Sequence, residues 1–131
     1  MWLYEGAYLT QFTYNQKKQE LELRPEFLKN LTSFLKLARK HNTKINLTFL
    51  DGNAFSNLKS RADLKLYWLS VFNNQHGKQI EFYEKAIAPV YKLIESDFKD
   101  VVTQIDLVNE VNALVSYNFF QSQNSLKSFL C

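Results

Sequence analysis

The stretch Val101–Val115, VVTQIDLVNEVNALV, runs a β-branched, apolar segment directly into an Asn-Glu pair, Asn109-Glu110. This composition predicts a buried strand over Val101–Val108. A carboxylate would then lie at the border of a core, where burial raises the pKa towards neutrality, as a general acid requires. The alternative is a glutamate that caps a helix or lies in a loop. Which of these roles Glu110 has decides how the whole chain is interpreted.

Before this stretch, strand-like and helix-like patterns alternate along the chain. The segment WLYEG, residues 2–6, resembles the end of a strand, and the polar residues 10–23 predict a loop. Pro25 suits the first position of an amphipathic helix of about 16 residues that ends near His41-Asn42. A second strand follows from Ile45 and stops at Asp51-Gly52.

The second half of the chain repeats this alternation. Residues 53–77 are mixed in character, with a short helix expected around residues 64–72. A strong apolar stripe predicts a helix over Lys78–Asp97, which Pro89 should kink. The strand that ends at Asn109-Glu110 comes next, and the tail is expected to be partly helical. Strands that alternate with amphipathic helices predict an α/β fold with a parallel sheet.

The composition and charge of the chain limit the classes of function that it can have. The 131 residues are 46% hydrophobic, enough for one modest domain, and the net charge of +3 comes from scattered lysines that form no nucleic-acid-binding stripe. A single cysteine, Cys131, and two distant histidines predict neither a disulfide nor a metal site, and no cofactor is expected. No signal peptide or membrane span is visible, so the location of a longer parent protein is left open.

Polar or acidic residues follow each of the three expected strands. In parallel α/β folds, ligands bind at this carboxyl edge of the sheet. For Asp51-Gly52 the alternative is an ordinary turn, and for Glu5 it is a solvated edge residue. The candidate ligand-binding residues at the strand ends are Glu5, Asp51, Asn53, Asn109 and Glu110.

Four segments together resemble (β/α)8-barrel glycoside hydrolases of the cellulase and β-mannanase superfamily. IDLVNE, residues 105–110, resembles the family's fourth-strand motif, and FYEKAIAPVYKLI, residues 82–94, resembles the third helix with its proline. Residues 23–55 resemble the second helix and third strand, and WLYEG resembles the end of the second strand. The resemblance covers about residues 1–115 and implies a single incomplete barrel-like domain over 1–131, a partial TIM barrel of about three parallel strands with flanking helices.

The resemblance also implies a chemistry. Glu110 would be the catalytic acid/base and Asn109 would bond the sugar 2-hydroxyl of a β-linked oligosaccharide or polysaccharide. The family's nucleophile follows the seventh strand, which lies outside this stretch, so the chain is expected to be inactive alone. Trp68, Tyr67 and Phe55 are candidates for stacking on sugar rings, with packing in the core as the alternative.

Two other readings stay open. One is a non-catalytic carbohydrate-binding or interaction module on a half-barrel, in which binding would depend on Trp68 or Tyr67 rather than on Glu110. The other is an unrelated small α/β domain with no sugar site. Three parallel strands taken from a barrel leave two open edges, so self-association through these edges is also expected.

Overall fold

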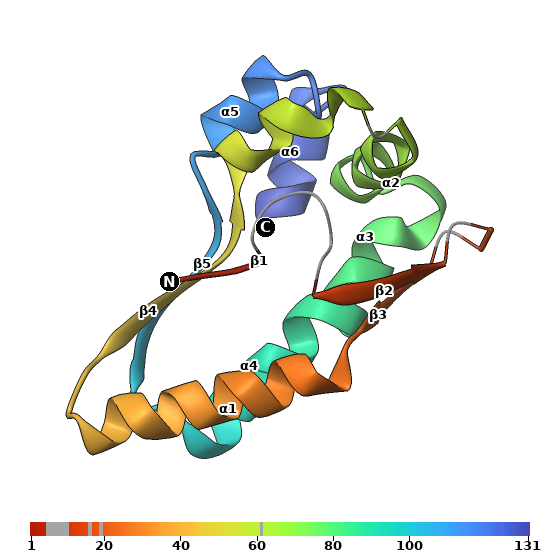
Figure 1. Cartoon of the computed structure of the whole chain (residues 1–131). Coiled ribbons are helices and arrows are strands. Elements are labelled where there is room, and N and C mark those ends of the chain that lie inside the picture. The colour runs from red at the N-terminus through yellow and green to blue at the C-terminus, as the bar shows by residue number, and fades with distance from the viewer. Residues whose placement is uncertain (5–10, 16, 19, 61) are drawn as a thin grey trace.

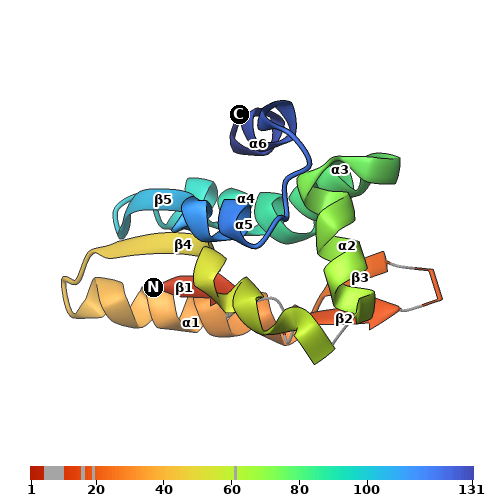
Figure 2. The same ribbon diagram turned by 90° about the horizontal axis from the view of Figure 1, so that it is seen from above.

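A computed structural model of the chain describes all residues except 5–10, 16, 19 and 61. Three strands form a parallel sheet in the order β1-β4-β5. They are β1 (Trp2–Tyr4), β4 (Ile45–Asp51) and β5 (Val102–Asn109). Figure 2 shows the three strands layered in that order. The expected α/β class and parallel sheet are confirmed, and neighbouring strands follow one another in chain order.

Residues 10–23 differ from the prediction of a polar loop. They contain an antiparallel hairpin of β2 (Phe12–Asn15) and β3 (Glu20–Leu23). The reason is a period of two, because Phe12 and Leu21 are buried whereas Thr13 and Glu22 point to solvent. At the turn, the side-chain oxygen of Asn15 accepts hydrogen bonds from the backbone N–H groups of residues 17 and 18.

The two long helical segments fall where the sequence predicts them. α1 (Pro25–Lys40) begins at the proline and ends at His41. The second segment consists of α3 (Lys78–Phe82), a π-helical turn η3 (Tyr83–Ile87) and α4 (Ala88–Asp97). Pro89 lies in the first turn of α4, where its missing N–H costs least, and the wider π turn directly precedes it. The sequence predicts a kink at Pro89, and the structure has a π turn over Tyr83–Ile87, just before this proline.

Shorter helices close the carboxyl end of the sheet. A 3₁₀ helix, η1 (Gly52–Ser60), follows β4, and α5 (Val111–Ser116) follows β5. In Figure 1, α5 lies beyond the upper ends of β4 and β5, and α1 lies at the lower side. The remaining helices are α2 (Ala62–Phe72), which confirms the short helix expected there, η2 (Gln75–Gly77) and α6 (Gln123–Leu130).

Two polar contacts join segments that are far apart in the sequence. The buried phenol of Tyr4 in β1 donates a hydrogen bond to the backbone carbonyl of Ala86 in η3. At the other end of the molecule, the Arg39 guanidinium binds both carboxylate oxygens of Asp100, at 2.6 and 2.7 Å, and lies 4.8 Å from the centre of the Phe98 ring. This bidentate pair joins the end of α1 to the turn that precedes β5.

Candidate functional site

The residues predicted at the ends of β4 and β5 come together in the structure. Asp51 is the register partner of Asn109, because Leu47 to Asp51 pair in parallel with Ile105 to Asn109. Each strand therefore delivers its last residue to the same edge of the sheet, and the next residues continue side by side. We call Asp51, Asn53, Asn109 and Glu110 the rim cluster.

A hydrogen bond joins the two halves of the rim cluster. The side-chain amide of Asn53 donates from Nδ2 to Oε2 of Glu110 at 2.6 Å, across 57 positions of sequence. Oδ1 of Asp51 accepts from the backbone N–H of Asn53 at 3.2 Å, which fixes the turn after β4. Asn53 thus orients the Glu110 carboxylate while its own backbone is held by Asp51.

The backbone at Glu110 has an unusual conformation. Its φ and ψ are both 53°, in the left-handed region, and it occupies the N-cap position of α5. A non-glycine residue in this region is uncommon, and such outliers gather at functional sites. Glu110 occupies the N-cap position, but it does not cap the helix through its side chain, because that side chain makes no hydrogen bond to α5.

Gly52 permits this arrangement through close packing. A Cβ at residue 52 would overlap the backbone carbonyl oxygen of Glu110 and would lie only 3.0 Å from that of Asn109. No larger residue therefore fits between the strand ends without displacing Glu110. The sequence predicts Gly52 only as part of a turn, because its close approach to a strand 57 residues away is a tertiary feature that no local pattern reveals.

The surroundings of Glu110 differ from the expected buried border. Glu110 is exposed, and Asn109 and Asp51 are partly buried. The carboxylate of Glu110 is therefore open to solvent where β5 ends. An exposed carboxylate held by an amide, beside a second carboxylate and a second amide, offers hydrogen-bond acceptors and donors to a hydroxyl-rich ligand.

The other candidates are placed elsewhere. Trp68 and Tyr67 have no exposed surface, and Phe55 is 2% exposed. Trp68 packs edge-on against Phe55 and Phe82 in the core. These aromatic residues therefore have the alternative role, packing in the core. The prediction that Trp68 stacks on a sugar ring is corrected, because its ring has no surface that a ligand could contact. Glu5 lies outside the described residues.

The described residues also limit other kinds of site. No three metal-ligating side chains gather in the part of the chain that the structure describes. Within the same residues, no helix is long and apolar enough to cross a membrane.

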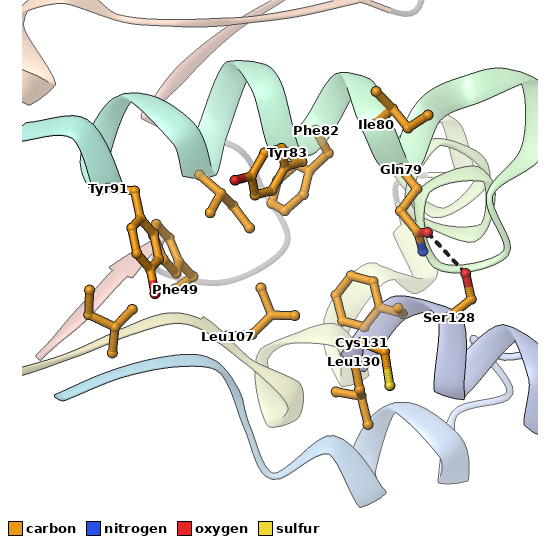
Figure 3. A pocket seen from close by; sticks show the side chains of 13 residues that line it. Phe49, Gln79, Ile80, Phe82, Tyr83, Tyr91, Leu107, Ser128, Leu130 and Cys131 are labelled. Atoms are coloured by element: carbon orange, nitrogen blue, oxygen red, sulfur yellow. Dashed lines mark hydrogen bonds between the residues drawn. The ribbon is translucent and has the colours of Figure 1, made fainter. Parts of the chain in front are cut away.

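A separate cavity of about 390 Å³ lies between the α3–α4 segment, the sheet and α6 (Figure 3). Phe49, Ile105 and Leu107 line it from the sheet, and Tyr83 and Tyr91 line it from the helix. None of the lining side chains is acidic or basic, and none of the lining residues belongs to the rim cluster. The cavity and the rim cluster are thus independent features.

Comparison of the chain with protein-family models, with curated proteins and with solved structures found no match. The resemblance to glycoside hydrolases therefore stays a prediction that depends on the motifs and on the geometry of the rim cluster.

Proposed function

We propose that this chain supplies the second to fourth βα units of a (β/α)8-barrel glycoside hydrolase acting on β-linked glycans, with Glu110 as the acid/base. The observation that carries this proposal is the hydrogen bond of 2.6 Å from Asn53 to Glu110, at the carboxyl ends of two adjacent parallel strands. Catalytic residues of such barrels come from this end of several strands.

The sheet order supports the same proposal. A barrel is built from parallel strands that neighbour one another in chain order, as β1, β4 and β5 do. The first helical crossover is α1, and the second ends in α3, η3 and α4. An unrelated α/β domain needs neither this consecutive order nor an Asn-Glu pair at the end of its third strand.

The chemistry divides between two carboxylates. In a retaining glycosidase the acid protonates the leaving oxygen while a nucleophile, about 5–5.5 Å from it, attacks the anomeric carbon. In this proposal Glu110 is the acid, Asn109 binds the sugar 2-hydroxyl, and the nucleophile follows a later strand of the complete barrel. The 131-residue chain then binds glycan at the rim cluster but hydrolyses none.

The test is a titration of the ¹⁵N-labelled chain with cellotetraose and with mannotetraose, followed by NMR. We expect shifts at the backbone amides of residues 52–53 and 109–110 and at the Asn109 side chain. Asn109→Ala should weaken binding roughly fivefold or more, as expected when a hydrogen bond to the ligand is lost. Asn112→Ala is the matched control, because Asn112 is exposed two residues after Glu110 on α5.

Three outcomes of the titration distinguish the proposed function from its alternatives. Shifts at the rim that Asn109→Ala abolishes and Asn112→Ala preserves support the proposal. Shifts that Asn109→Ala leaves unchanged would assign binding to another surface. The absence of any shift with either oligosaccharide at millimolar concentration would favour the unrelated α/β domain.

A further inference from the structure

The α3–α4 segment carries three large apolar side chains that line the cavity beside the sheet and remain largely exposed. Ile80 is 60% exposed, Tyr83 is 54% exposed and Tyr91 is 46% exposed. All three come from the same helical segment, as Figure 3 shows. Contiguous apolar surface of this kind is uncommon on a soluble monomer and marks interaction sites.

Tyr83 and Tyr91 form a ridge between two adjacent hollows on this segment. Tyr83 and Tyr91 line the cavity beside the sheet, and they also line an adjacent, more open hollow of about 430 Å³ along the same helix. Ala88, Lys92, Glu95 and Ser96 complete the second hollow. The small side chain of Ala88 lies between the two tyrosines in sequence and leaves room for a close approach, so the ridge of one helix can enter the groove of another.

Two of the exposed charges along this segment, Glu84 and Lys92, are self-complementary, and a third, Glu95, already pairs with Lys99 at 2.5 Å. Glu84 lies four residues before Ala88 and Lys92 lies four residues after it, and both side chains are exposed. If two copies of the segment pack antiparallel about a two-fold axis at Ala88, Glu84 of each copy faces the partner's Lys92. Two identical ion pairs then form at once, as an isologous interface requires.

We propose that the α3–α4 face, with Tyr83, Ala88 and Tyr91 at its centre, binds a second copy of this chain in a symmetric dimer. The acidic Glu84 and the basic Lys92 favour a second copy of the chain as the partner, because a neutral apolar ligand would leave the charges of both side chains unpaired. The interface uses a helix surface, so it is distinct from pairing through the open edges of the sheet. It does not depend on the rim cluster or on the proposed glycosidase function.

Charge reversal tests the proposal directly. Sedimentation velocity over about 5–500 µM should show a concentration-dependent dimer for the wild-type chain. Glu84→Lys places two lysines at each contact and Lys92→Glu places two glutamates there, so each single variant should weaken dimerisation at least about tenfold. The double variant E84K/K92E should dimerise like the wild type. A 1:1 mixture of the two single variants should form heterodimers, because their charges complement each other.

Matched controls are Glu26→Lys and Lys36→Glu, which reverse exposed charges on α1. They should leave dimerisation unchanged, and circular dichroism should show that all variants are folded. The proposal is overturned if the wild-type chain is monomeric throughout the range. It is also overturned if the single reversals dimerise as well as the wild type, or if neither the double variant nor the mixture restores association. In the last two cases the copies meet through another surface, such as the sheet edges.

Discussion

Nδ2 of Asn53 lies 2.6 Å from Oε2 of Glu110, and this hydrogen bond connects the turn after β4 to the residue after β5. It is a direct side-chain hydrogen bond between the two halves of the rim cluster. The donor is a neutral amide, so the bond orients the carboxylate without neutralising its charge. The contact has consequences for stability that do not depend on any ligand.

Asn53→Asp should convert this attraction into repulsion. The variant places a second carboxylate against Glu110, so we expect a lower melting temperature than that of the wild type at pH 7. The difference should narrow at about 1 M salt, which screens the repulsion between the two carboxylates. Thermal melts followed by circular dichroism at low and high salt check this. Asn30→Asp, at an exposed position of α1, should show no such salt-dependent difference.

Gly52→Ala should destabilise the chain by about 1–3 kcal/mol, the usual cost of adding a methyl group where no space exists. The added Cβ would overlap the Glu110 carbonyl, so the amide signals of residues 109–111 should also shift. Urea denaturation and NMR measure the two effects. Gly77→Asn is the control, because Gly77 has φ +70°, which asparagine tolerates, and a Cβ there would meet no atom within 4 Å. Equal stability of the two variants would contradict the close packing at Gly52.

The sequence predicts those elements whose pattern is long. α1 and the parallel strands β4 and β5 are apolar over several turns or residues, so local periodicity and burial agree. The hairpin β2–β3 was missed because its strands have four residues each and are rich in polar side chains. The alternation of Phe12, Thr13 and Tyr14 was the available signal.

The rim cluster was predictable in part. Three strand ends rich in polar residues predict a shared edge, and the pairing of Asp51 with Asn109 agrees with that prediction. The exposure of Glu110 and the contact of Gly52 with a strand 57 residues away depend on how the strand ends pack, and neither has a local pattern. The burial of Trp68 similarly depends on rings from two other segments of the chain, Phe55 of η1 and Phe82 of α3.

Trp68→Ala should unfold or nearly unfold the chain. Removal of a fully buried tryptophan costs about 3–5 kcal/mol, a large fraction of the 5–15 kcal/mol that stabilises a typical domain. Leu66→Ala is the matched control on the same helix, because Leu66 is 59% exposed, and its cost should be small. Urea titrations followed by circular dichroism compare the two. A stable Trp68→Ala variant that had lost only glycan binding would restore the sugar-platform assignment.

The pair of Arg39 and Asp100 should contribute mainly at neutral pH. The hydrogen bond from Arg39 holds the pKa of the Asp100 carboxyl below its usual range. A carboxyl whose pKa is lowered by folding stabilises the folded state above its unfolded pKa of about 3.9, and this stabilisation is lost as the pH falls through the folded pKa. Asp100→Asn should therefore lower the melting temperature slightly at pH 7 and hardly at all near pH 2.

A double-mutant cycle isolates this pair. Arg39→Lys keeps the charge but cannot form both bonds of 2.6 and 2.7 Å, so it should lose most of the same stability. Combined with Asp100→Asn it should cost less than the sum of the single changes. Strict additivity would mean that the two side chains contribute independently.

Tyr4→Phe should remove the hydrogen bond to the Ala86 carbonyl and leave that buried acceptor without its partner. The expected loss is about 1–3 kcal/mol at pH 7, measured by urea denaturation. Tyr117→Phe is the control, because Tyr117 is 37% exposed and should change stability little.

Tyr4→Phe should also change how the stability of the chain depends on pH in the alkaline range. Burial raises the pKa of the Tyr4 phenol above its usual value. In the unfolded chain this phenol ionises near pH 10, so the contribution of Tyr4 is fully present below that pH and declines as the pH rises further. The wild-type chain should therefore lose stability above pH 10 more steeply than Tyr4→Phe, and their difference should shrink. Parallel curves above pH 10 would contradict a neutral, hydrogen-bonded Tyr4 that fastens β1 to the π turn.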